Sequence, residues 1–154
     1  MTEYSATISW RRDGQAFVDN CYSRAHAWQF DGGLTVPASA SPHIVPLPQS
    51  VPENVDPEEA FVAALSSCHM LFFLSFAAAQ GIIVDRYDDH AVGYLQKDDT
   101  GRLAMTRVVL RPQAAYAGDR LPQRAEIEAL HDRAHASCFI ANSVHTEVVT
   151  ELVA

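Results

Sequence analysis

The chain has 154 residues, of which 48% are hydrophobic and 19% charged, a composition typical of one globular domain over residues 1–154. A formal net charge of −8 argues against nucleic-acid binding, which needs a basic face, and against docking on anionic membranes. Residues 1–4 show no basic stretch followed by an apolar one, so we expect a cytoplasmic protein without a signal peptide.

The first third of the sequence predicts β structure. Residues 4–10 alternate loosely between apolar and polar, and Arg12–Gln15 contains a hairpin signal. Residues 16–30 form a longer β-like run that ends at the glycine turn 31–33. We therefore expect a hairpin followed by further antiparallel pairing.

Residues 36–57 hold six of the eight prolines. Proline fixes φ and removes a backbone donor, so this segment is predicted to be neither a central strand nor a helix. A loop of this length inside a compact domain is uncommon and often functional.

A long helix is predicted next. Asp56 is a suitable N-cap, Pro57 suits the first helical position, Glu59 completes a capping box, and Gly81 is a natural stop. Residues 61–80 carry no charge and could span a bilayer by length. Several serines and a histidine within them, with no flanking basic cluster, favour a buried core helix and no membrane partner.

The second half alternates strands with one more helix. Residues 82–96 read as a strand, 97–101 as a turn, and 103–116 as its antiparallel partner. Residues 121–137 have the apolar spacing of a helix, and 144–153 form a final strand. The predicted fold class is α+β, with antiparallel sheets and two main helices, the longer one central and buried.

Two of the three cysteines are candidates for chemistry. Cys68 lies in the middle of the long helix, eleven residues past Pro57, where the helix dipole has faded. A cation from elsewhere would have to hold it as a thiolate. Cys138 follows the second helix, while Cys21 has no cation-rich surroundings and reads as structural. Burial as an ordinary small side chain is the alternative for both candidates.

A metal site is a weaker interpretation of the same residues. Cys68, His69, His135 and Cys138 include metal-ligand residue types at suitable spacing. Adjacent residues on a helix, however, point about 100° apart and do not easily share one tetrahedral ion. We therefore expect neither a metal nor another cofactor.

Charged partners for Cys68 are few. Glu58 precedes it by ten residues on the predicted helix, a separation of about 15 Å along the axis. Glu58 can therefore serve the thiol only through an intermediary or across a subunit interface. Arg24, His26 and His43 are the candidate cations near the proline-rich segment, and Arg24 leads into it from the β-like run.

Two segments resemble motifs of the OsmC/Ohr family, the osmotically induced and organic hydroperoxide resistance proteins. Residues 56–68 resemble its central-helix motif, in which Asn/Asp-Pro-Glu precedes a cysteine placed ten residues after the glutamate. Residues 134–142 resemble the second motif, a cysteine following Ala-His. The order of elements matches over nearly the whole chain.

The resemblance implies a thiol peroxidase that works as an intertwined homodimer with sites at the subunit interface. By this analogy Cys68 attacks a small organic hydroperoxide and becomes a sulfenic acid. Cys138 then closes a disulfide that a dithiol such as dihydrolipoamide reduces. Glu58 matches the family's glutamate, and Arg24 is our match for the arginine that pairs with it.

The residues themselves fit this chemistry, which needs a thiolate, a nearby cation and a second thiol that traps the sulfenate. Walls built from Phe61, Leu71, Phe72 and Phe73 would favour apolar hydroperoxides. Two other classes remain open: a cysteine hydrolase using Cys68 with a histidine base, and a non-catalytic redox sensor or small-ligand binder.

Overall fold

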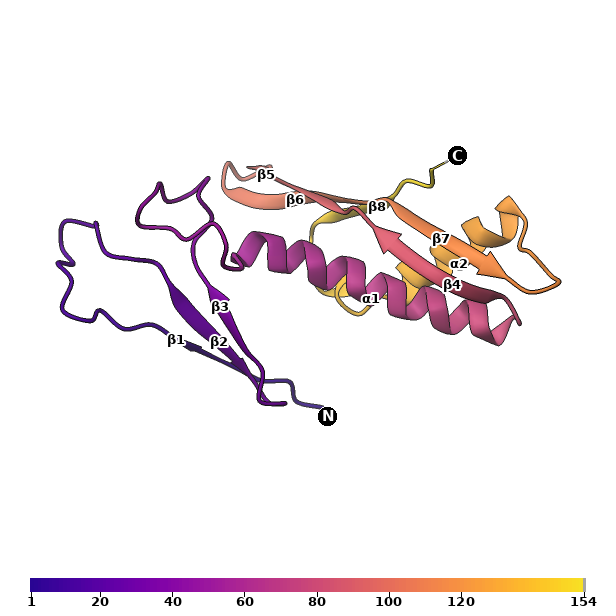
Figure 1. Ribbon diagram of the computed structural model, residues 1–154. Coiled ribbons are helices and arrows are strands. Elements are labelled where there is room, and N and C mark those ends of the chain that lie inside the picture. The colour runs from indigo at the N-terminus through magenta and orange to yellow at the C-terminus, as the bar shows by residue number, and fades with distance from the viewer. Residues whose placement is uncertain (154) are drawn as a thin grey trace. The chain divides into compact units, whose positions relative to one another are not determined.

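The computed structural model describes residues 1–153, which divide into two compact units, Met1–Ala60 and the chain from Phe61 onward (Figure 1). In chain order the elements are β1 (Ala6–Ser9), β2 (His26–Phe30), β3 (Thr35–Ala38), α1 (Pro57–Ala79), β4 (Ile83–Asp89), β5 (Val92–Lys97), β6 (Leu103–Leu110), β7 (Pro112–Ala117), α2 (Arg124–Ser137), the 3-10 turn η1 (Ala141–Ser143) and β8 (Glu147–Thr150). Helix α1 begins in the first unit and continues into the second.

The first unit is an antiparallel sheet in the order β1-β2-β3. The predicted hairpin at Arg12–Gln15 is wrong as a strand connection, because β1 pairs with β2 only after an irregular excursion over residues 10–25. A local turn does form, with the Gln15 N–H donating to the Arg12 carbonyl over 3.1 Å. Aromatic side chains within this segment pack against each other: the Phe17 and Tyr22 rings stack with centroids 4.7 Å apart.

The proline-rich segment is mostly irregular, as predicted, but its first residues extend β3. Pro37 lies in β3, which is an edge strand, so its missing donor costs no central ladder bond. The loop beyond is tied back to the sheet, since the Ser39 N–H donates to the Val55 carbonyl over 2.9 Å and the Val51 N–H to Ser39 Oγ over 2.9 Å. Its long course therefore has a defined conformation.

Helix α1 begins as its sequence predicts. The Glu59 N–H donates to Asp56 Oδ1 over 2.8 Å, and the Asp56 N–H donates to Glu59 Oε1 over 2.9 Å, which is a capping box. Past its end, Gly81 adopts a φ of 72°, a conformation that glycine permits.

Only one narrow stripe of α1 is buried within the chain. The stripe has four-residue spacing and comprises Leu65, His69, Phe73 and Ala77. The rest of the helix is nevertheless apolar, and by length and composition alone the helix could cross a membrane. Five further apolar residues of α1 are partly buried against the core, namely Phe61, Val62, Phe72, Leu74 and Phe76, while Leu71 remains 60% exposed.

The second unit departs from the predicted long hairpin. Each arm is broken, so that β4 pairs with β7 while β5 and β6 join a different sheet in the order β5-β6-β8. Asp89 lies at the break: its Oδ1 accepts the Arg111 N–H over 2.6 Å and its Oδ2 accepts Ser66 Oγ–H over 2.5 Å. A side chain thus satisfies the backbone donor that the interrupted ladder leaves unpaired.

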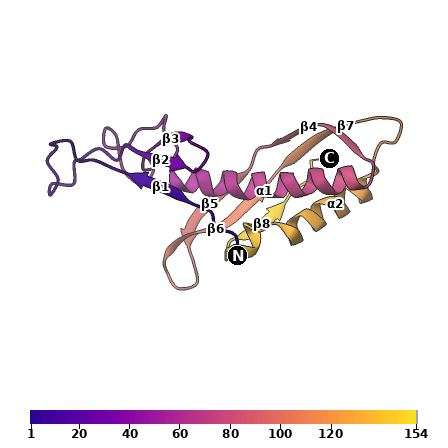
Figure 2. The same ribbon diagram turned by 90° about the horizontal axis from the view of Figure 1, so that it is seen from below.

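The predicted α+β class with antiparallel sheets and two main helices is confirmed, with one exception in the pairing: strand β8 pairs with β6 in parallel. Parallel neighbours need a crossover connection, and the segment through α2 supplies it. Helices α1 and α2 run side by side along β4 and β7 (Figure 2). Their shared core contains Phe73 and Ala77 from α1 with Leu130 and Ala134 from α2.

Candidate functional site

The structure brings the two predicted thiols together from different helices. Cys68 is partly buried in the middle of α1, and Cys138 is the C-cap residue of α2. Cys68 is among the groups that shift the pKa of Cys138. One turn further along α1, Phe72 meets Phe139 edge to face, with ring centroids 5.0 Å apart. Both thiols are free in this structure.

The two thiols differ in their surroundings. Cys138 is only 1% exposed, and the Ala141 N–H donates to its Sγ over 3.4 Å. Burial, followed by the neighbouring Cys68, raises the pKa of the Cys138 thiol. Cys138 is therefore a protonated thiol near neutral pH, whereas Cys68 is the more accessible of the pair.

Glu58 lies in the first turn of α1 with one carboxylate oxygen, Oε2, buried and without a hydrogen-bond partner. Burial is the largest cause that raises the pKa of this carboxyl group. No ion pair to Glu58 forms among residues 1–153. A buried carboxylate oxygen without a donor would gain from a cation supplied from outside the described contacts.

Arg24 is held within the first unit. Its guanidinium lies over the Tyr22 ring, 3.6 Å from the centroid, and donates to the Asn20 side-chain oxygen over 2.8 Å. Its backbone N–H donates to the carbonyl of Gln49, in the proline-rich loop, over 2.7 Å. The described part of the chain therefore does not pair Arg24 with Glu58, and their joint role remains a prediction for the assembled protein.

Arg24 also lines a cavity of about 470 Å³ in the first unit. The lining residues are Trp10, Phe17, Tyr22, Arg24, His26, Ser39, Ala40 and Pro57. This is an apolar, largely aromatic hollow with a guanidinium in its wall, a composition suited to an organic molecule that carries a polar or anionic group.

The predicted aromatic wall of the thiol site is only partly correct. Phe72 lies beside the Cys138 segment through its contact with Phe139. Phe73 is fully buried in the core, and Leu71 is 60% exposed. Successive helical residues point about 100° apart, so residues 71–73 cannot line one site within a single chain.

A pair of histidines was not predicted from the sequence. His69 of α1 and His131 of α2 are both buried, and His69 Nε2 lies 2.9 Å from His131 Nδ1. Burial is the largest cause that lowers the pKa of each imidazole to about 4, so both are neutral at pH 7. The one sequence feature that indicates burial of these histidines is their position on apolar helix faces. His69 lies between Leu65 and Phe73 on one face of α1, and His131 follows Leu130 in α2.

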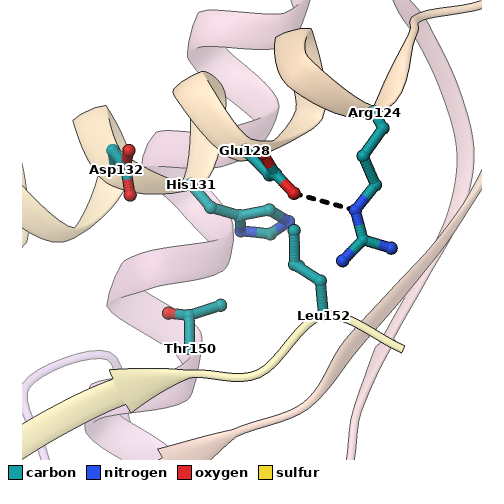
Figure 3. Close-up of a pocket in the computed structure, with 6 residues that line it drawn as sticks. All are labelled: Arg124, Glu128, His131, Asp132, Thr150 and Leu152. Carbon is teal, nitrogen blue, oxygen red and sulfur yellow. Dashed lines mark hydrogen bonds and ion pairs between the residues drawn. The ribbon is translucent and has the colours of Figure 1, made fainter. Parts of the chain in front are cut away.

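The histidine pair does not extend to a metal centre. Among residues 1–153 no three His, Cys, Asp or Glu side chains are grouped so that they could hold a metal ion. On its other side His131 lines a cavity of about 200 Å³ in the second unit (Figure 3).

Comparison with known proteins confirms the fold class and the resemblance to the OsmC/Ohr family. Residues 51–153 match the OsmC-like protein family. An OsmC-like protein of unknown function from Vibrio cholerae is 59% identical, with a TM-score of 0.98 over 99% of this chain and 100% of that chain. No curated protein matches the sequence.

More distant solved structures share the fold. The organic hydroperoxide resistance protein OsmC from Legionella pneumophila is 18% identical, with a TM-score of 0.68 over 99% of this chain and 96% of that one. The organic hydroperoxide resistance protein OhrB of Bacillus subtilis is 21% identical, with a TM-score of 0.66 over 97% and 98%. The matched segment holds Glu58, Cys68 and Cys138, and the chain belongs to the OsmC-like family.

Proposed function

We propose that this protein is a cytoplasmic, thiol-dependent peroxidase that reduces organic hydroperoxides with electrons from a dithiol. The observation that carries the proposal is the meeting of Cys68 and Cys138 at the contact of α1 with the end of α2. Membership of a family whose distant structural relatives include organic hydroperoxide resistance proteins supports a peroxide-related redox role.

In the proposed cycle the Cys68 thiolate attacks the terminal oxygen of the hydroperoxide. The O–O bond breaks, the leaving alkoxide takes up a proton and departs as an alcohol, and Cys68 becomes a sulfenic acid. The Cys138 sulfur then attacks the Cys68 sulfur, and the hydroxyl leaves as water with the Cys138 proton. A dithiol reduces the resulting disulfide and is itself oxidised to a disulfide.

The unequal environments of the thiols support this division of roles. The partly buried Cys68 can be reached by a substrate, while the 1% exposed Cys138 is shielded from direct oxidation. The raised pKa of Cys138 keeps it protonated until a sulfenic acid forms beside it. Burial thus supports the order in which the two thiols react.

We further propose that the working unit is a homodimer. Outside its buried stripe α1 exposes Leu71 and several alanines, and a second copy would cover this apolar surface. Glu58 is about 15 Å along the helix from Cys68 of its own chain, but the helix of a partner can bring a second Glu58 near that thiol. Arg24 would then pair with the unpartnered Oε2 of Glu58 and stabilise the Cys68 thiolate.

The neighbouring histidine does not favour the hydrolase alternative. A cysteine hydrolase needs an imidazole base beside its nucleophile. His69, although adjacent to Cys68 in sequence, uses its Nε2 in a bond with His131. A non-catalytic sensor would oxidise at the same cysteines without turning over.

Steady-state consumption of cumene hydroperoxide with dihydrolipoamide tests the proposal. Wild-type protein and the Cys21→Ser control should turn over, because Cys21 is exposed and lies in a different part of the chain. Cys68→Ser should be inactive, because a hydroxyl is not ionised near neutral pH. Wild-type oxidation without turnover would indicate the sensor, and a fully active Cys68→Ser protein would refute the assignment of the nucleophile.

A further inference from the structure

A buried hydrogen bond joins the two helices that carry the thiols. His69 of α1 and His131 of α2 are 1% and 4% exposed, and their facing nitrogens lie 2.9 Å apart. Among residues 1–153 this is the only side-chain hydrogen bond between α1 and α2. The other contacts between these helices are the apolar shared core of the second unit and the guanidinium of Arg133 in α2, which lies over the Phe76 ring of α1, 4.1 Å from its centroid.

The bond has a defined direction. A hydrogen bond between two neutral imidazoles needs one proton between the facing nitrogens, here His69 Nε2 and His131 Nδ1. The other ring nitrogen of His69, Nδ1, is buried without a hydrogen-bond partner. A buried lone pair is tolerated better than a buried N–H without an acceptor. His69 therefore donates from Nε2 to His131 Nδ1, and the second nitrogen of His131 carries a proton.

The second nitrogen of His131, which carries this proton, belongs to a ring that borders a cavity. His131 lines this small cavity together with Arg124, Glu128, Asp132, Thr150 and Leu152 (Figure 3). Among residues 1–153 no protein group accepts a hydrogen bond from the second nitrogen of His131, so water in the cavity is the acceptor available to it. The surroundings of both rings thus select one tautomer pair and one orientation.

Such a contact can fix the register of α1 on α2. Apolar packing is not directional and is compatible with small shifts of one helix along the other, whereas a buried hydrogen bond is directional. Cys68 directly precedes His69, and Cys138 follows His131 by seven residues, about two helical turns. A disulfide between them requires a narrow range of Cα separation, about 4.4–6.8 Å.

We propose that the His69–His131 hydrogen bond is a positioning device that holds Cys68 and Cys138 in register for disulfide closure. The proposal rests on the Cys68–Cys138 disulfide of the proposed function. It assigns the histidines no contact with the peroxide. Disulfide closure, the step after peroxide attack, would thus depend on a buried imidazole pair that lies along the same two helices but outside the thiol site.

Three variants distinguish the effect of the His69–His131 hydrogen bond from the effect of side-chain packing. In His131→Asn an amide atom can occupy the place of the imidazole Nδ1 and keep the bond. His131→Leu has nearly the same size as that variant but leaves His69 Nε2 unpaired. In the double variant His69→Leu with His131→Leu no buried polar atom of the pair remains, so the fold is expected to persist without the bond.

Disulfide closure is measured without peroxide. In a Cys21→Ser background, oxidised glutathione forms a mixed disulfide with Cys68 and releases one glutathione. The Cys138 sulfur then attacks the Cys68 sulfur, and the second glutathione leaves as a thiol with the Cys138 proton. Acid quenching and mass spectrometry give the rates of loading and closure separately, and thermal unfolding reports on the fold.

We expect His131→Asn to close at close to the wild-type rate. Both leucine variants should close at least about tenfold more slowly, because misplacement by about 1 Å costs up to a hundredfold, while the loading rate stays unchanged. Closure of a folded double variant at the wild-type rate would overturn the proposal, as would a wild type that never closes. A wild type that closes normally but consumes no hydroperoxide would contradict the proposed function and leave this inference standing.

Discussion

At the scale of single residues, the buried imidazoles make stability depend on pH. The pKa of His69 and of His131 is lowered to about 4 by burial, from an ordinary value of 6.5. The unfolded chain therefore binds protons more readily than the folded one as the pH falls from 6.5 towards 4. Lowering the pH from 7 to 5 should cost about 2 kcal/mol per histidine in the free energy of unfolding.

Urea unfolding at pH 7 and pH 5 measures this loss. The double variant His69→Leu with His131→Leu should lose less stability over the same interval, since only its remaining groups titrate. An identical pH dependence in wild type and variant would show that the imidazoles are not held neutral by the fold.

Arg24 is the residue on which the proposed thiolate activation depends. Replacing it with methionine removes the guanidinium, so the rate constant of Cys68 oxidation by cumene hydroperoxide should fall about tenfold to a hundredfold. Arg102→Met, at an exposed arginine outside the thiol site, is the matched control. Stopped-flow oxidation compares the two, and an Arg24→Met protein as fast as the control would direct attention to His26 or His43.

At the scale of the elements, the middle of α1 and the end of α2 should become covalently linked. One equivalent of hydroperoxide is expected to produce an intramolecular Cys68–Cys138 disulfide, because these thiols are neighbours from the two helices. Cys21 should stay reduced. Peptide mapping under non-reducing conditions checks this, and a major product that contains Cys21 would contradict it.

How far the elements could be predicted from the sequence follows from the range of the interactions. The start of α1 was predictable because Asp56 and Glu59 cap it locally. The break between β4 and β5 was not, because Asp89 bonds to Ser66 and Arg111, which are more than twenty residues away in opposite directions. The pairing of β8 with β6 likewise depends on a tertiary crossover.

The residues of the candidate site also differ in whether a local sequence pattern could identify them. Cys68, Cys138 and Glu58 could be selected because each lies in a short motif with fixed spacing. The His69–His131 contact joins residues separated by 62 positions. No local pattern specifies which face of α2 meets α1, so either histidine alone reads as an ordinary core residue.

At the scale of the whole molecule, the apolar surface of α1 predicts self-association. Leu71 on α1 is 60% exposed in the single chain. Sedimentation velocity at micromolar concentration should show a dimer, and Leu71→Asp should weaken it by placing a charge in the interface. Leu103→Asp, at a leucine of β6 that is 65% exposed, is the matched control. A monomeric wild type, or equal effects of the two changes, would contradict this interface.

The separation of Arg24 from the two thiols has an evolutionary consequence. Cys68 and Cys138 lie in the second unit, whereas Arg24 and the aromatic cavity around it lie in the first. If both regions serve one reaction, selection can alter the residues around the cation without touching the cysteine pair. Relatives that keep the same two thiols could then diverge in the molecules they accept through changes confined to the first fifty residues.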